Sequence, residues 1–179
     1  MRITACLLLL QLVVTRAFAQ TPDSSFQKGD HLLNVGIGLN SYYEGGLPLS
    51  LSYEKATTDK VSIVFGIDYL HRNYTDLYLG KYSFTAIYLG VRGAFHVNSF
   101  LEEIDFYDSH LDIYVGAALG YRYFHWSDSY ASYYYDFGGG LYYGAYLGGK
   151  YYFTPRISAF MELGATGSTN ARVGIGIKL

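Results

Sequence analysis

Apolar residues alternate with small or polar residues through most of this chain, and this two-residue rhythm limits the fold more than any other feature. The last nine residues, 171–179, show it most clearly, because every odd position is apolar and every even position is glycine or a cation. Successive side chains on a β-strand point to opposite faces. Such a run therefore predicts a strand with one apolar face and one small or polar face.

The same rhythm occurs eight times along the chain. The predicted strands span residues 31–39, 47–55, 61–70, 83–97, 111–126, 141–153, 157–165 and 171–179. Eight period-two runs separated by turn segments indicate an all-β protein built from antiparallel neighbours.

The two faces of these strands differ in kind. One face is apolar and carries no charge, whereas the other mixes glycines and large aromatic residues with a set of polar residues. The polar set is Lys150, Glu162, Arg172, Arg92, Asp112, Arg122, Glu54, Asp68 and Lys178. Glycine weakens a strand, but a narrow lumen needs small residues opposite large ones. We therefore predict an eight-stranded antiparallel up-and-down transmembrane β-barrel with the polar face inward.

The N-terminal segment predicts export. A short basic start precedes an apolar stretch, and Ala17-Phe18-Ala19 offers the small residues that a signal peptidase requires. We expect residues 1–19 to be a cleaved secretory signal peptide and residues 20–179 to form the barrel domain. The single cysteine, Cys6, lies in the signal, so the mature chain has no thiol.

Charge and hydropathy narrow the function classes. Removing Arg2 and Arg16 leaves 11 basic against 15 acidic residues, and no basic patch suggests nucleic acid. After the signal, no segment approaches 18 consecutive apolar residues, which argues against transmembrane helices.

An even number of strands places both termini on one side, the periplasmic side in outer-membrane barrels. Residues 56–60 and 154–156 fit short periplasmic turns, and residues 40–46, 71–82, 127–140 and 166–170 are predicted to be the longer loops that face outward. The connection 98–110 is long and acidic. We interpret it as a solvated flap, with a docking site for a periplasmic partner as the alternative.

The runs 88–96, 114–123 and 160–164 make the chain resemble the small eight-stranded outer-membrane β-barrels of Gram-negative bacteria, the OmpA and OmpX-like group. The resemblance covers essentially the whole mature chain. It implies a multi-pass barrel in the outer membrane, in contact with membrane lipids and lipopolysaccharide. It also implies a final strand read by the barrel-assembly machinery, where Leu179 stands in place of the usual aromatic residue.

The register of the hairpins predicts which side chains meet inside the barrel. Pairing Phe153 with Ile157 and Ala165 with Ala171 makes Glu162 diagonal to both Lys150 and Arg172. A buried carboxylate needs such partners. The sequence predicts a Lys150, Glu162 and Arg172 cluster inside the barrel.

Other functions have some support in particular residues. Eight strands enclose just enough space for side chains, which argues against passage of large solutes and leaves a passive small-solute or ion pore as the runner-up. His125-Trp126-Ser127 looks like the His-x-Ser element of outer-membrane lipid A deacylases, with Asp136 as a loose substitute for the orienting acid. The five histidines lack ligand spacing, so we expect no metal site and no cofactor.

Tyrosines gather near the predicted extracellular ends. They are Tyr42, Tyr43, Tyr74, Tyr78, Tyr130, Tyr133, Tyr134 and Tyr135. Tyrosine suits both the membrane interface and recognition surfaces. These loops therefore predict an aromatic girdle or a binding surface for a partner outside the cell.

A soluble secreted lipid-binding barrel remains the rival fold, because alternation alone does not separate inside from outside. The sparse charges on the polar face favour the membrane form. The sequence as a whole predicts a non-enzymatic outer-membrane barrel that contributes to envelope structure or surface interaction.

Overall fold

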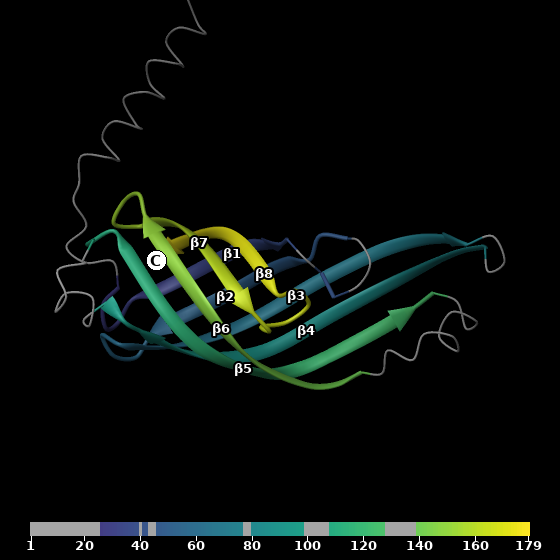
Figure 1. Ribbon diagram of the computed structural model, residues 1–179, viewed down its shortest axis with the longest axis horizontal. Coiled ribbons are helices and arrows are strands. Elements are labelled where there is room, and N and C mark those ends of the chain that lie inside the picture. The colour runs from purple at the N-terminus through teal and green to yellow at the C-terminus, as the bar shows by residue number, and fades with distance from the viewer. Residues whose placement is uncertain (1–25, 40, 43–45, 77–79, 99–107, 128–138) are drawn as a thin grey trace, which may run out of the picture.

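The chain forms a closed antiparallel barrel in a computed structural model that describes residues 26–39, 41–42, 46–76, 80–98, 108–127 and 139–179. The strands are β1 (His31–Gly38), β2 (Leu49–Ala56), β3 (Val61–Asp76), β4 (Gly80–His96), β5 (Leu111–Trp126), β6 (Gly140–Tyr152), β7 (Ile157–Gly164) and β8 (Ala171–Lys178). Each strand pairs with the next, and β1 pairs with β8, as in Val35↔Ile175 (Figure 1). The eight-stranded fold predicted from the alternation is confirmed. The predicted signal, residues 1–19, lies outside the described residues.

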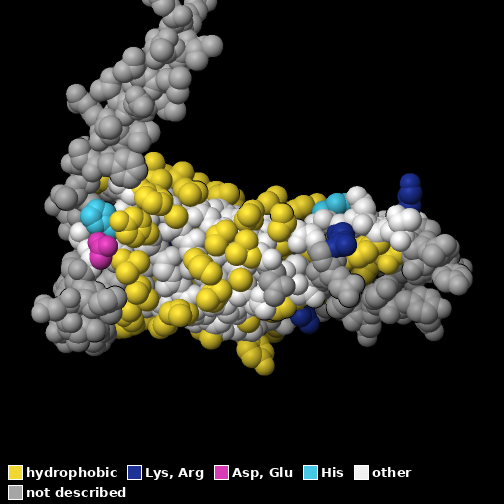
Figure 2. Space-filling model, turned by 45° about the horizontal axis from the view of Figure 1, so that its top comes forward, with side chains coloured by type: hydrophobic (Ala, Val, Ile, Leu, Met, Phe, Trp, Pro, Cys, Tyr) yellow, Lys and Arg dark blue, Asp and Glu magenta, His cyan; other side chains and the backbone are white. Residues whose placement is uncertain are grey.

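The barrel wall is inverted relative to a soluble protein. Outward-facing apolar side chains are widely exposed, for example Leu119 at 60% and Tyr143 at 84%, whereas most of the charged residues of the strands are buried inside. Figure 2 shows hydrophobic side chains over the middle of the visible face, with Lys and Arg appearing toward one end. Closure pairs both edges of the sheet, which leaves no unpaired edge along the apolar part of the wall. Among the described residues, no helix is long and apolar enough to cross a membrane.

The wall is much taller on one side. β3 and β4 are 16 and 17 residues long, whereas β1, β2, β7 and β8 have 8 residues each. The pairing of β2 with β3 ends at Leu49↔Tyr69, but β3 continues against β4 as far as Asp76↔Gly80. The C-terminus lies at the end opposite the β3–β4 tip (Figure 1). We call the end that holds Phe26 and Leu179 the terminal mouth, and the other end the loop mouth.

The prediction of a loop over residues 71–82 was wrong, because most of this segment is strand. Beyond Tyr69 the outward positions are the polar His71, Asn73 and Thr75. The alternation of apolar residues therefore stops at Tyr69, while the backbone pairing of β3 with β4 continues to Asp76. The change in polarity marks where the wall leaves the apolar belt, not where the strand ends.

The register between β7 and β8 also differs from the prediction. Leu163, not Ala165, lies opposite Ala171, which places Glu162 directly opposite Arg172. The strand ends at Gly164, whose φ of 133° favours glycine. The chain then turns inward, and Thr166, Ser168 and Thr169 are buried at the loop mouth.

Glycines inside the barrel face aromatic rings on neighbouring strands. Tyr114 lies opposite Gly148 and Tyr146 lies opposite Gly116 in the β5–β6 ladder. A Cβ on Gly148 would be 2.3 Å from Cε2 of Tyr114, so the ring occupies the space that a side chain would need. Small residues therefore make room for a solid aromatic filling.

This packing predicts that Gly148→Val weakens the barrel. The added side chain collides with the Tyr114 ring, and overpacking of this kind costs about 1–3 kcal/mol. The measurement is the midpoint of urea unfolding in detergent micelles, followed by the heat-dependent mobility shift of folded barrels on gels. Gly93→Val is the matched control, because a Cβ at Gly93 meets nothing within 4 Å. Equal losses from both variants would contradict the packing account.

Candidate functional site

The barrel interior is filled by a column of ion pairs that cross the lumen. Three of the pairs, Glu54–Lys150, Arg92–Glu162 and Arg172–Asp68, join strands that are not neighbours, so they connect distant parts of the wall. We divide the column into a terminal layer, a middle layer and an upper layer, counted from the terminal mouth.

The terminal layer centres on Glu54 of β2. Lys150 of β6 donates to one carboxylate oxygen, Oε2, and Ser62 Oγ donates to the other, Oε1, at 2.9 Å. Asn34 Nδ2 adds a third hydrogen bond to Oε2 at 3.2 Å. Glu54 and Lys150 are each 2% exposed. A buried pair with this many hydrogen bonds meets the condition under which ions are tolerated in a protein interior.

His96 of β4 completes the terminal layer. Its Nδ1 lies 2.7 Å from Asp112 Oδ1, and its Nε2 lies 3.0 Å from Ser62 Oγ. Phe26 stacks on the imidazole with ring centroids 3.5 Å apart and an interplanar angle of 11°. Sequence reasoning did not select His96. Its even position, in phase with Arg92 on β4, was the available signal that it faces the lumen.

Serine, histidine and aspartate in this order also form the nucleophile, base and orienting acid of many hydrolases. The hydrogen-bond directions here oppose that chemistry. Ser62 gives its proton to Glu54, so its oxygen accepts from His96 instead of losing a proton to it. Ser62 is also fully buried, and Phe26 stacks on its partner His96. These contacts are those of a buried polar cluster.

The middle layer joins Arg92 of β4 to Glu162 of β7. Arg92 Nη1 lies 2.6 Å from Glu162 Oε2, and Tyr114 donates its hydroxyl proton to Glu162 Oε1 at 3.2 Å. Arg92 Nη2 also donates to Ser52 Oγ at 3.3 Å. The guanidinium lies over the Tyr146 ring at 5.3 Å. A cation between a carboxylate and an aromatic face is well compensated for its loss of water.

The upper layer joins Arg172 of β8 to Asp68 of β3. Arg172 Nη2 donates to Asp68 Oδ2 at 2.9 Å, and the backbone and hydroxyl of Ser168 donate to the same oxygen. Arg172 Nε lies 3.7 Å from Glu162 Oε2, which links the upper layer to the middle one. The inward turn after β7 therefore closes the lumen from the loop mouth.

The predicted cluster of Lys150, Glu162 and Arg172 is brought together only in part. Glu162 lies near Arg172, but Lys150 reaches Glu54 across the barrel, and Arg92 takes the position expected for Lys150 beside Glu162. The prediction considered only neighbours within the sheet. In a closed barrel, a long inward side chain extends toward the axis and can contact a residue on the opposite wall.

The remaining members of the predicted polar set lie nearer the ends. Lys178 pairs with Asp30 at 2.7 Å at the terminal mouth, and Arg122 lies over the Phe124 ring at 5.8 Å nearer the loop mouth. Asp112 is in the terminal layer, opposite Lys150 in the β5–β6 ladder but bonded to His96.

Aromatic side chains fill the lumen above the upper layer. Phe84 and Tyr88 are buried with Leu70 and Ala86, and other aromatic residues pack around them. Phe84 lies 4.6 Å from Trp126 between ring centroids. The interior therefore changes from ion pairs to aromatic packing toward the loop mouth.

The predicted loop tyrosines divide into two groups. Tyr74 lies in β3 and stacks on Tyr82 of β4 at 5.2 Å, so its assignment to a loop was wrong. Tyr42 is 49% exposed near the loop mouth, and burial of part of its ring raises the pKa of its hydroxyl. Tyr43, Tyr78, Tyr130, Tyr133, Tyr134 and Tyr135 lie outside the described residues.

The acidic connection 98–110 is described only at its ends. Asn98 donates to Asp112 and accepts from the backbone of Ile113, which fixes the first residue of this connection to β5. At the other end, the His110 backbone N–H donates to Asp108 at 2.9 Å and lowers the pKa of that carboxyl.

His125 and Ser127 share the outer face at the end of β5. The Ser127 hydroxyl oxygen accepts from the Ser83 backbone N–H at 2.8 Å, and its own N–H donates to the Ser83 carbonyl. Ser127 thus fixes β5 to β4. Asp136 lies outside the described residues. Within the described ranges, no group of three or more His, Cys, Asp or Glu is arranged to hold a metal ion.

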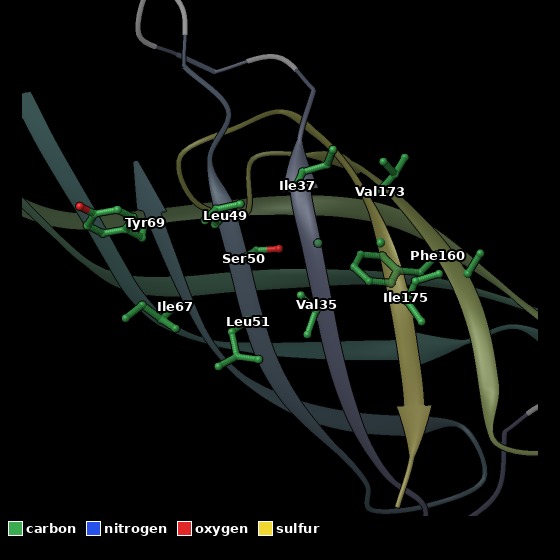
Figure 3. A pocket seen from close by; sticks show the side chains of 13 residues that line it. Val35, Ile37, Leu49, Ser50, Leu51, Ile67, Tyr69, Phe160, Val173 and Ile175 are labelled. Carbon is green, nitrogen blue, oxygen red and sulfur yellow. The ribbon is translucent and has the colours of Figure 1, made fainter. Parts of the chain in front are cut away.

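An apolar hollow opens in the wall on the short side of the barrel. Its lining comes from β1, β2, β3, β7 and β8, and Figure 3 shows among others Val35, Leu51 and Ile175. The lining is almost entirely hydrocarbon. Apart from Ser50, its lining offers no polar side chain to orient a water-soluble ligand.

Comparison with solved structures identifies proteins that share this fold. The outer membrane protein OprG from Pseudomonas aeruginosa aligns with a TM-score of 0.60 at 11% identity, covering 88% of this chain and 99% of OprG. A transmembrane β-barrel designed de novo gives 0.54 at 17% identity, covering 87% and 99%. Neisserial surface protein A gives 0.50 at 12% identity, covering 84% and 95%.

No family model matches the chain, and no curated protein matches it. The structural comparisons, together with the exposed apolar wall, show that the chain has the fold of the small eight-stranded outer-membrane barrels.

The ion-pair column predicts a large effect of removing Glu162. Glu162→Leu leaves Arg92 buried without its carboxylate, and breaking a buried pair costs about 3–5 kcal/mol. We expect a matching fall in the free energy of unfolding by urea in micelles. The double variant Arg92→Met/Glu162→Leu regains much of that loss, because no uncompensated charge remains.

Asp108→Ala serves as the control for this experiment. The Asp108–His110 pair is partly exposed to solvent, and surface pairs contribute little, about 0–1 kcal/mol. The single variant Arg92→Met completes the set. If the stability loss of the double variant equals the sum of the losses of Arg92→Met and Glu162→Leu, the two charges do not interact.

Proposed function

We propose that this protein is an integral outer-membrane barrel without catalytic activity, which contributes to envelope structure and presents a surface for recognition outside the cell. The observation that carries the proposal is the inverted wall, with apolar side chains outward and paired charges inward. Only a hydrocarbon surrounding compensates a wall of this kind. Export through the secretory pathway with loss of residues 1–19 is part of the proposal.

Lipids are the first partners under this proposal. The exposed belt ends in tyrosines, Tyr53 and Tyr151 toward the terminal mouth and Tyr69 and Tyr123 toward the loop mouth. Tyrosine rings favour the two interfaces of a bilayer. The hollow over β1, β2 and β8 accepts an acyl chain of an outer-membrane lipid or of lipopolysaccharide. Insertion depends on the barrel-assembly machinery, which acts on β8.

Recognition outside the cell is assigned to the tall β3–β4–β5 side. There the outward face turns polar, and β3 extends past the last residue that β2 can pair with. A strand that extends beyond its neighbour offers backbone groups to an added strand. A protein or glycan partner at the cell surface fits this end better than a partner in the periplasm.

The alternative functions find less support. A pore for small solutes needs a free path, but three layers of ion pairs and an aromatic cluster occupy the lumen of the described barrel. A lipid A-modifying enzyme needs an activated serine, and the Ser127 oxygen already accepts from a backbone N–H. A soluble lipid carrier needs an apolar lumen, whereas the lumen here is charged.

Orientation and membrane insertion are tested together by cysteine labelling. Lys81→Cys on β4 lies on the tall side, and Lys60→Cys lies in the turn between β2 and β3 near the terminal mouth. A membrane-impermeant maleimide is expected to label Lys81→Cys on intact Gram-negative cells. Lys60→Cys reacts only after the outer membrane is permeabilised, because its turn faces the periplasm.

Fractionation of the same cells provides the control. Both variants are expected in the outer-membrane fraction and in solution only with detergent. Recovery in the soluble periplasm, or labelling of Lys60→Cys on intact cells, would contradict the proposal.

A further inference from the structure

A short segment closes the terminal mouth of the barrel from outside the strands. Phe26 enters the mouth and is only 6% exposed. Gly29 and Asp30 bond to the backbone of Ala56, and Asp30 pairs with Lys178. Residues 26–30, which we call the seal, therefore cover the terminal layer, and the Phe26 ring lies directly on His96.

Hydrogen-bond directions define which ring nitrogens of His96 carry protons. Asp112 is a carboxylate and only accepts, so Nδ1 must donate to it. Ser62 has one proton and donates it to Glu54 Oε1, so toward Nε2 the serine oxygen must accept. Both nitrogens are then donors, and a histidine with two N–H groups carries a positive charge.

Charge balance in the terminal layer leads to the same result. Two carboxylates, Glu54 and Asp112, face one permanent cation, Lys150, which bonds to Glu54. Among the described residues, the one cationic partner within 4.0 Å of Asp112 is His96. Asp112 is fully buried, and an isolated carboxylate there would carry a heavy desolvation cost. A charged His96 makes the layer neutral.

From these contacts we propose that His96 is a resident imidazolium whose proton holds the seal in the terminal mouth. The flat stack of Phe26 on the ring gains attraction from the positive charge, since an aromatic face favours a cation. Loss of the proton leaves either Nδ1 facing a carboxylate oxygen or Ser62 turned away from Glu54. The layer then holds one excess negative charge, and Phe26 loses its cation.

The groups that contact this histidine come from several elements. They are Phe26 of the seal, Glu54 of β2, Ser62 of β3, and Asp112 and Tyr114 of β5. Asn34 and Lys150 bond to Glu54, and Asn98 bonds to Asp112. The seal is therefore expected to loosen when the charge on His96 is removed by substitution.

The direct test needs no variant. Nitrogen-15 NMR of histidine-labelled wild-type barrel in micelles is recorded at about pH 7, where an exposed histidine is mostly neutral. We expect His96 to show two protonated ring nitrogens. A neutral tautomer of His96 at this pH overturns the proposal, because the ring would then carry no charge to hold the seal.

The mechanical consequence is tested with a spin label on Lys28→Cys, an exposed position in the seal. We expect an immobile label in the wild-type barrel and a several-fold larger mobile fraction in the background His96→Gln. His31→Gln is the matched control, because His31 is next to the seal but bonds to Tyr53 on the outer face, and the label is expected to stay immobile in that background.

If the label is as immobile in the His96→Gln barrel as in the wild type, the assigned role of His96 is wrong. If His96→Gln does not fold, the nitrogen spectrum of the wild type still decides between a charged and a neutral ring.

Discussion

Pairing of buried charge across a closed lumen is the interaction on which the rest of this structure depends. The outer wall is apolar, so the ionisable residues of the strands gather at the interior or at the ends. Inside, each charge must find a partner and further hydrogen bonds, because an isolated ion there would be too costly. Glu54–Lys150, Arg92–Glu162 and Arg172–Asp68 meet this need and connect strands that are not neighbours. Backbone hydrogen bonds between neighbouring strands hold the wall together, and the ion pairs of the column connect strands across the lumen.

The column also explains the composition of the inner face. Long cations and tyrosines need space toward the axis, and glycines opposite them supply it, as Gly148 does for Tyr114. The filling continues to both mouths, with Phe26 at one end and Ser168 at the other. A lumen filled in this way provides stability and a fixed shape for the tall side of the barrel. It agrees with a role at the surface better than with transport.

The sequence predicted the architecture well because the alternation directly encodes which side of the wall a residue faces. The alternation of positions along each strand was enough to predict which side chains face outward and which face inward. Outward examples are Val35, Val91 and Ile175, and inward examples are Glu54, Arg92 and Arg172. The alternation did not predict the end of β3, because at residues 71–76 the outward positions become polar while the strand continues. The sequence also did not predict the ion pairs that cross the lumen. Lys150 and Glu54 lie on strands that do not pair, so strand register says nothing about their contact. His96 was passed over because its partners Ser62, Asp112 and Phe26 come from three other segments.

In the described part of the barrel, side chains occupy the lumen from one mouth to the other. Current through the purified protein in planar lipid bilayers measures this most directly. A barrel closed by its ion pairs, its aromatic cluster and Phe26 is expected to insert without producing a steady conductance above that of the bare bilayer. A stable, reproducible single-channel conductance in the wild-type barrel would contradict the account, because it would require a continuous water path through all three layers.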